Sequence, residues 1–182
     1  MFELILSIAL FVLTVAVVGL FAMMGELSSR VPQEDVVDVA TPIDNAALGT
    51  APQIWPDDIT HLATREFAAL VVLSTSCSSC RRIAAGATGQ LSLPPDVAVI
   101  VPAPSLADGQ QFVAESSVIS EFPHSIDVGG EWLTKNLAVD ISPSVLVFNR
   151  GALVTAHTFS SAAALNELLD RPVERDREDS HA

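Results

Sequence analysis

The only two cysteines of the chain, Cys77 and Cys80, are separated by two serines and follow an apolar run at 68–73. Such a run predicts a buried strand, and the cysteines would then open the next helix. Two thiols three positions apart in a first helical turn can close and reopen a disulfide. The helix N-terminus favours a thiolate, the form that attacks a disulfide. The pattern predicts thiol–disulfide chemistry, with Cys77 as the attacking thiol and Cys80 as the resolving thiol.

Metal binding is the alternative use of this spacing. A structural zinc site needs four ligands, and the chain has no second cysteine pair. Two soft sulfurs can hold Cu(I), so metal delivery remains a weaker third possibility. We expect no metal or other cofactor, because the four histidines are scattered along the chain: His61, His124, His157 and His181.

Charge excludes one class of partner. The 182 residues include nine Lys and Arg against 22 Asp and Glu, which gives a formal net charge of −13. Nucleic acids and anionic membrane surfaces attract basic proteins. We therefore expect no nucleic-acid partner.

The N-terminal segment is apolar from Leu4 to Met24 and carries no charge there. Twenty-one helical residues span about 30 Å, the thickness of a bilayer core. A cleaved signal peptide would begin with basic residues and end at a small-residue cleavage site, whereas this segment begins with Glu3 and ends in 22–25, Ala-Met-Met-Gly. We predict a retained transmembrane anchor over 1–27, in contact with the lipid bilayer. The one nearby basic residue, Arg30, weakly favours a cytoplasmic domain.

Three further regions follow the anchor. Residues 28–51 contain prolines, acids and little periodicity, which is typical of a linker. Residues 52–170 are expected to fold as one domain, and the charged tail at 171–182 is expected to be disordered.

Hydrophobic patterns within 52–170 predict alternating strands and helices. Pro143 directly precedes one expected strand, and residues 149–151, Asn-Arg-Gly, predict a hairpin turn. The expected strands are 69–74, 96–101, 126–128, 144–148 and 152–159. The expected helices are 59–67 (or an irregular lead-in), 77–90, 109–118, 131–137 and 160–169.

This order resembles the thioredoxin-like arrangement, an α/β fold in which helices flank a mixed sheet. The resemblance implies that Pro143 is a cis-proline facing the cysteine pair. More narrowly, the chain resembles the membrane-anchored thiol:disulfide interchange group, and is nearest to the thioredoxin-like accessory protein of methylamine utilisation. Three segments carry this likeness: the anchor exit at 19–27, the cysteine segment at 72–81 and the proline strand at 142–151.

Four positions depart from thioredoxins proper. Ser76 replaces the tryptophan before the first cysteine, Ser78 and Ser79 replace the Gly-Pro pair, and Val71 replaces a buried carboxylate that assists proton transfer. These departures affect the expected redox potential and the speed of catalysis.

Further site residues are expected around the cysteine pair. Ser142 would offer backbone groups to a substrate strand, and the hydroxyls of Ser76, Ser78 and Ser79 would contact the substrate. Arg81 lies one helical turn after Cys77, where its cation would favour the thiolate, although surface solubility explains an arginine equally well.

These features predict a membrane-tethered thiol:disulfide oxidoreductase that acts on exported proteins. Disulfides persist outside the cytoplasm, so the domain is expected on the extracytoplasmic side of the cell membrane, despite Arg30. Its partners would be an exported client with cysteines and a membrane redox partner. The alternative is an accessory subunit of a membrane complex that uses the domain for docking, with Cys77–Cys80 as a structural disulfide.

Overall fold

The computed structural model describes residues 40–88, 93–94, 96–116 and 118–170. The chain divides into two compact units, Met1–Val37 and Asp38–Ala182, and every described residue belongs to the second. Within the described ranges no helix has the length and apolar character needed to cross a bilayer. The predicted anchor over Leu4–Met24 and the predicted tail at 171–182 lie outside these ranges.

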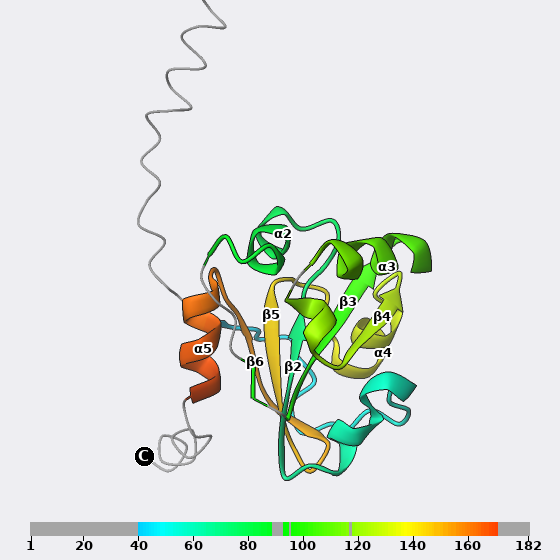
Figure 1. The fold of residues 1–182 in the computed structure, drawn as a ribbon. Coiled ribbons are helices and arrows are strands. Elements are labelled where there is room, and N and C mark those ends of the chain that lie inside the picture. Colours follow the sequence, from blue (N-terminus) through cyan, green and yellow to red (C-terminus); the bar gives the residue numbers. More distant parts are fainter. Residues whose placement is uncertain (1–39, 89–92, 95, 117, 171–182) are drawn as a thin grey trace, which may run out of the picture. The chain divides into compact units, whose positions relative to one another are not determined.

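A six-stranded mixed sheet forms the centre of the described unit (Figure 1). Its strand order is β1-β6-β5-β2-β3-β4. The pairs β2–β3 and β3–β4 are parallel, whereas β2–β5, β5–β6 and β1–β6 are antiparallel. The strands are β1 (Thr41–Pro42), β2 (Phe67–Val72), β3 (Val97–Ala103), β4 (His124–Val128), β5 (Ser144–Asn149) and β6 (Ala152–Thr158).

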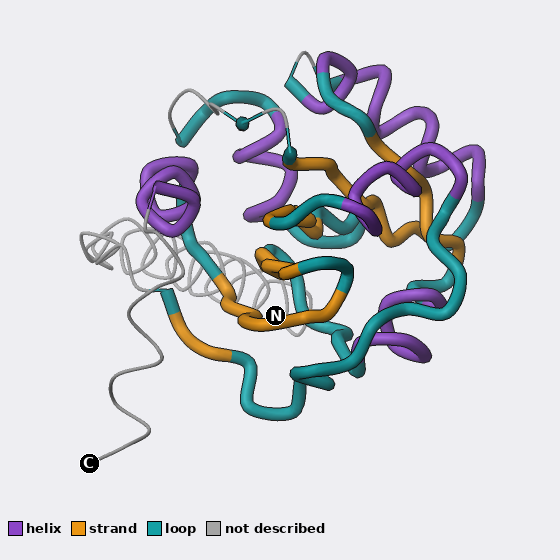
Figure 2. The backbone as a smooth tube through the Cα atoms, turned by 90° about the horizontal axis from the view of Figure 1, so that it is seen from below, coloured by secondary structure: helices purple, strands orange, loops and turns teal. Residues whose placement is uncertain are grey.

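Helices surround this sheet (Figure 2). On one face α2, α3 and α5 share an apolar cluster with the sheet, and on the other face η1 and α4 do so. This arrangement fits the predicted thioredoxin-like fold. The helices are η1 (Asp57–Thr64, a 3-10 helix), α2 (Ser78–Ala84), α3 (Leu106–Glu115), η2 (Ile119–Glu121, also 3-10), α4 (Glu131–Leu137) and α5 (Ala162–Asp170).

The central strand β2 shows why both faces are covered. Val71 contributes to the cluster beneath α2, whereas Leu70 and Val72 contribute to the opposite cluster. All three side chains are at most 1% exposed. Successive strand residues point to opposite faces, so an uninterrupted apolar run requires a partner layer on each side.

The predicted hairpin turn is confirmed between β5 and β6. Arg150 and Gly151 both have positive φ, 48° and 78°, as the tight turns that match the twist of a hairpin require. Gly151 has a second reason to be glycine, because a Cβ atom there would lie 2.8 Å from the carbonyl oxygen of Ala63.

Part of the predicted linker belongs to the folded unit. Thr41 and Pro42 pair with the end of β6, and the N–H of Ile43 donates to the carbonyl of Ala156 at 2.9 Å. Further along, the N–H of Gly49 donates to the carbonyl of Leu153 at 2.7 Å. Thr41 and Pro42 therefore add an edge strand to the sheet, and the segment that follows them is hydrogen-bonded to β6.

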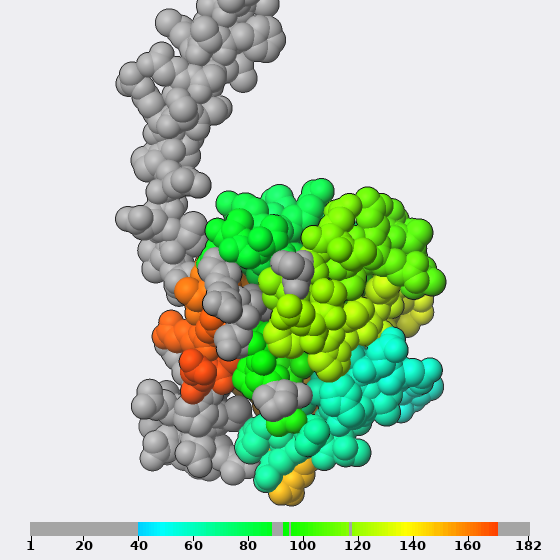
Figure 3. Space-filling model, in the orientation of Figure 1, coloured from blue at the N-terminus to red at the C-terminus, as the bar shows by residue number. Residues whose placement is uncertain are grey.

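The boundaries of the elements differ from those predicted. The helix that follows Cys77 ends at Ala84 and not near Gln90, so the expected extension through residue 88 was wrong. Gly86 adopts a left-handed φ of 71°, which ends a helix readily. The C-terminal end of α2 packs beside α3 (Figure 3). The hydroxyl of Ser116, which directly follows α3, donates to the carbonyl of Ala84 at 2.9 Å.

Candidate active site

The cysteine pair lies where β2 leaves the sheet and α2 begins. The intervening turn is held by two backbone hydrogen bonds, from Thr75 N–H to the carbonyl of Pro102 at 3.1 Å and from Cys77 N–H to the carbonyl of Ser74 at 3.2 Å. Cys77 is the N-cap residue of α2. Its side chain therefore lies at the end of the helix, as the sequence predicted.

Cys77 and Cys80 form a disulfide whose two sulfurs have different surroundings. Cys77 is partly exposed, whereas Cys80 is 0% exposed and packs in the apolar cluster beneath α2. The backbone N–H of Cys80 also donates to the sulfur of Cys77 at 3.1 Å. Of the two cysteines only Cys77 has solvent-exposed surface, and its sulfur has a hydrogen-bond donor that stabilises negative charge on it.

The proline loop faces this disulfide. The Ser142–Pro143 peptide bond is cis, which confirms the prediction, and the Ser142 carbonyl oxygen lies 3.6 Å from the sulfur of Cys77. Two hydrogen bonds hold the loop, from Phe159 N–H to the carbonyl of Pro143 at 3.3 Å and from the hydroxyl of Ser144 to the carbonyl of Ile141 at 2.9 Å. Segments 65 residues apart in sequence are therefore in contact at this site.

The other residues predicted for the site lie around the cysteine pair, but their side chains do not contact a common atom. Ser76 is exposed and shares a 2.9 Å hydrogen bond with the hydroxyl of Ser74. Ser78 is exposed, and the hydroxyl of Ser79 accepts from Arg82 at 3.5 Å. Arg81 is exposed and forms no ion pair with any residue that the structure describes. The substrate-contact and thiolate-tuning roles of these residues stay predictions.

Among the described residues, no buried carboxylate lies beside Cys80 in its apolar cluster. Val71, at the position where thioredoxins carry one, is fully buried in that cluster. Asp127 is the one buried carboxylate among the described residues, and it instead accepts the backbone N–H groups of Trp132 and Leu133, each at 3.0 Å. The described residues also contain no group of three His, Cys, Asp or Glu side chains that could hold a metal ion.

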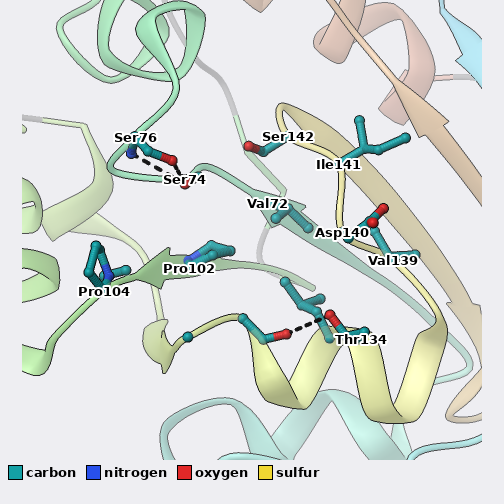
Figure 4. Close-up of a pocket in the computed structure, with 14 residues that line it drawn as sticks. Val72, Ser74, Ser76, Pro102, Pro104, Thr134, Val139, Asp140, Ile141 and Ser142 are labelled. Carbon is teal, nitrogen blue, oxygen red and sulfur yellow. Dashed lines mark hydrogen bonds between the residues drawn. The ribbon is translucent and has the colours of Figure 1, made fainter.

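A groove of about 370 Å³ adjoins the disulfide. Figure 4 shows Pro102 and Pro104 on one side, the segment 139–141 across from them, Thr134 below, and Ser142 above with the Ser74–Ser76 turn. Sequence reasoning identified Ser76 and Ser142 but missed the rest of the lining. Those residues come from the ends of β2 and β3, from loops and from α4, which are far apart in sequence, and no motif marks them.

Comparisons with known proteins give distant structural likenesses only. No protein-family model and no curated protein matches the sequence. The thioredoxin domain of a thiol-disulfide oxidoreductase from Bacteroides vulgatus is 10% identical with a TM-score of 0.45, over 72% of this chain and 96% of that one. StoA from Bacillus subtilis is 14% identical with a TM-score of 0.42, over 58% and 83%.

A third similar structure is a secreted Mycobacterium tuberculosis disulfide oxidoreductase described as homologous to DsbE of Escherichia coli. It is 17% identical with a TM-score of 0.40, over 56% of this chain and 78% of that one. Likenesses this distant do not identify a substrate or a partner. The chain's own geometry carries the assignment: a thioredoxin-like sheet with a CxxC disulfide beside a cis-proline, an arrangement consistent with a thiol–disulfide oxidoreductase.

Proposed function

We propose that the protein is a membrane-tethered thiol:disulfide oxidoreductase that exchanges disulfides with exported client proteins. The observation that carries the proposal is the asymmetry of the disulfide. Cys77 is partly exposed and its sulfur lies 3.6 Å from the Ser142 carbonyl oxygen, whereas Cys80 is fully buried. A disulfide that serves only as a structural link has no need of one reachable sulfur beside an open backbone carbonyl.

The oxidised form can accept two electrons from a client dithiol. A client thiolate attacks the sulfur of Cys77, a client–Cys77 disulfide forms, and the Cys77–Cys80 bond breaks with its electron pair on Cys80, which takes up a proton. The second client thiolate then attacks the client sulfur of the mixed disulfide. The client leaves with a disulfide, and Cys77 leaves as a thiolate.

The reverse sequence reduces a client disulfide. The Cys77 thiolate attacks one client sulfur and forms a mixed disulfide, while the other client sulfur leaves as a thiolate. Cys80 then loses its proton and attacks the sulfur of Cys77, the Cys77–client bond breaks, and the bound client sulfur leaves as a second thiolate while the internal disulfide is restored. The N–H of Cys80 at 3.1 Å from Cys77 would stabilise the thiolate in both directions. The redox poise of the partner sets the direction: a membrane thiol partner would recharge a reductase, and a quinone-linked partner would recharge an oxidant.

The proline loop would position the client. The Ser142 carbonyl faces the disulfide, so an extended client segment can pair its backbone N–H with this carbonyl as a short added strand. Such pairing is independent of the client's side chains. It would hold the client's sulfur in line with Cys77.

The location of the domain follows from its chemistry and its N-terminal sequence. The apolar, uncharged stretch Leu4–Met24 is long enough to anchor the chain in a membrane. Exchangeable protein disulfides persist in extracytoplasmic compartments. We therefore place the tethered domain on the extracytoplasmic side of the cell membrane.

A trapping experiment in cells tests this function. In the Cys80→Ser variant the mixed disulfide through Cys77 cannot be resolved internally, so clients should accumulate as adducts that reductant releases. The matched Cys77→Ser variant keeps one cysteine, but a buried one, and should trap no client. If Cys80→Ser traps nothing and the double variant Cys77→Ser/Cys80→Ser keeps full function, the domain is instead a docking subunit with a structural disulfide.

A further inference from the structure

We propose that the groove beside the disulfide binds a lysine or arginine side chain that flanks the client's cysteine. The inference rests on the proposed function and adds to it a chemical class of client. The groove is the space of about 370 Å³ between Pro102–Pro104, α4 and the segment Val139–Ser142 (Figure 4).

The position of the groove makes it part of the client's path. Ser76, directly before Cys77, and Ser142, whose carbonyl faces the Cys77 sulfur, both line it. A client segment paired with the Ser142 carbonyl would extend across the groove. Residues of an extended chain advance about 3.3 Å each, so a side chain one or two positions from the client's cysteine reaches the groove.

The walls of the groove suit an aliphatic chain. Pro102, Pro104 and Ile141 contribute exposed apolar surface, with Ile141 45% exposed, whereas Val72, Leu133 and Val139 are at most 2% exposed. The polar side chains that line the groove are four hydroxyls and one carboxylate: Ser74, Ser76, Thr134, Ser142 and Asp140. The stem of a lysine or arginine can lie along such apolar surface while its charged end remains in water.

Asp140 is the one charged residue among those that line the groove. It is exposed and forms no ion pair or hydrogen bond within the part of the chain that the structure describes. Lys135, on the neighbouring helix α4, is paired with Glu131. The Asp140 carboxylate therefore remains free to pair with a cation supplied by the client.

The charge of the whole chain favours the same client. A formal net charge of −13 attracts cationic segments and repels acidic ones before contact. Apolar walls, a single unpaired carboxylate at the groove and an acidic chain together select an aliphatic stem that ends in a positive charge.

Matched peptide disulfides test the inference with the reduced full-length protein. Each peptide carries one cysteine as a mixed disulfide with thionitrobenzoate. The peptides differ only in the residue two positions from that cysteine, which is lysine, norleucine or glutamate. Cys77 attacks the peptide sulfur and thionitrobenzoate leaves; Cys80 then forms the internal disulfide and releases the peptide thiol. The rate of thionitrobenzoate release measures recognition, and a thionitrobenzoate disulfide of 2-mercaptoethanol measures intrinsic reactivity.

The wild-type protein should react about two- to fivefold faster with the lysine peptide than with the norleucine peptide, as an exposed ion pair allows, and slowest with the glutamate peptide. Salt should reduce the lysine preference. Asp140→Asn should reduce this lysine preference to the small part that the net charge of the chain supplies, without changing the rate with the small disulfide. Asp58→Asn removes the same charge from η1, away from the groove, and should keep the full lysine preference.

Thr134→Trp provides an independent variant, because the indole would fill the groove from α4. It should slow both the lysine and the norleucine peptides, reduce the difference between their rates to the part that the net charge supplies, and leave the small disulfide unaffected. Equal wild-type rates with all three peptides, or a lysine preference that survives undiminished in Asp140→Asn or Thr134→Trp, would overturn the groove inference alone. If Cys77 reacts with neither the peptides nor the small disulfide, the proposed function itself fails.

Discussion

Asp127 caps α4, the helix that forms one wall of the groove, and the substitution Asp127→Asn tests this capping role. Its two carboxylate oxygens accept the N–H groups of Trp132 and Leu133, each at 3.0 Å, and the side chain is buried at 6% exposure. These N–H groups belong to the first turn of α4, whose N-cap residue, Gly130, has no side chain to accept them. Asp127 thus caps α4 from three residues before the cap position.

The cost of Asp127→Asn can be estimated from these contacts. An amide has one acceptor oxygen, so one of the two N–H groups loses its partner and meets an NH₂ group instead. An unsatisfied buried donor costs about 1–3 kcal/mol, and loss of the negative charge at the helix N-terminus adds about 0.3–1 kcal/mol. We expect the free energy of unfolding to fall by about 2–3 kcal/mol.

Urea unfolding followed by tryptophan fluorescence measures this loss directly. Trp132 lies in α4, and its ring centroid is 5.7 Å from that of Trp55, the only other tryptophan of the chain. With a slope of about 1.5 kcal/mol per molar urea, the midpoint should fall by roughly 1–2 M. The matched control Asp140→Asn removes an exposed carboxylate and should change stability by less than about 0.5 kcal/mol. Equal midpoints for the two variants would refute the capping role.

Two further predictions concern the hairpin turn and α4. In thermal unfolding, Gly151→Ala should lower stability by about 1–3 kcal/mol more than Gly49→Ala. Both positions have positive φ, but only at Gly151 would a Cβ atom meet the carbonyl oxygen of Ala63. An equal loss of stability in the two variants would contradict this reasoning. The Lys135 side chain, by its hydrogen bond and then its charge, holds the pKa of Glu131 below its usual value of 4.5. The small stabilisation from this pair is therefore complete above pH 4.5 and is lost as the pH falls through the lowered pKa. An NMR titration should show this pKa rising in Lys135→Met, and an unchanged pKa would count against the pair.

Much of the domain could be predicted because its elements are locally encoded. The apolar run before Cys77 became β2, α4 matched its expected bounds of 131–137, and the turn at 149–151 joined β5 to β6. In each case the deciding interaction lies within a few residues of the chain. Periodicity, turn chemistry and helix propensity report such interactions directly.

Other elements could not be predicted because distant residues decide them. Thr41 and Pro42 have no strand signal of their own and become β1 by pairing with the end of β6. The Asp127 cap left one signal that could have been read, an acid shortly before a Gly-Gly pair and a predicted helix. The groove left no such signal, since its walls come from strand ends, loops and one helix that are separate in sequence.

The sequence by itself determined the cysteine pair, the order of β2 to β6 with the helices α2 to α5, and the proline that precedes β5. Those features depend on residue identity and on neighbours along the chain. Only the tertiary structure decided how deeply each cysteine is buried, that the Ser142 carbonyl lies 3.6 Å from the sulfur of Cys77, and that Asp140 lines a groove beside the pair. Exposure and charge pairing depend on what the rest of the fold places around a side chain, and packing between distant segments sets both.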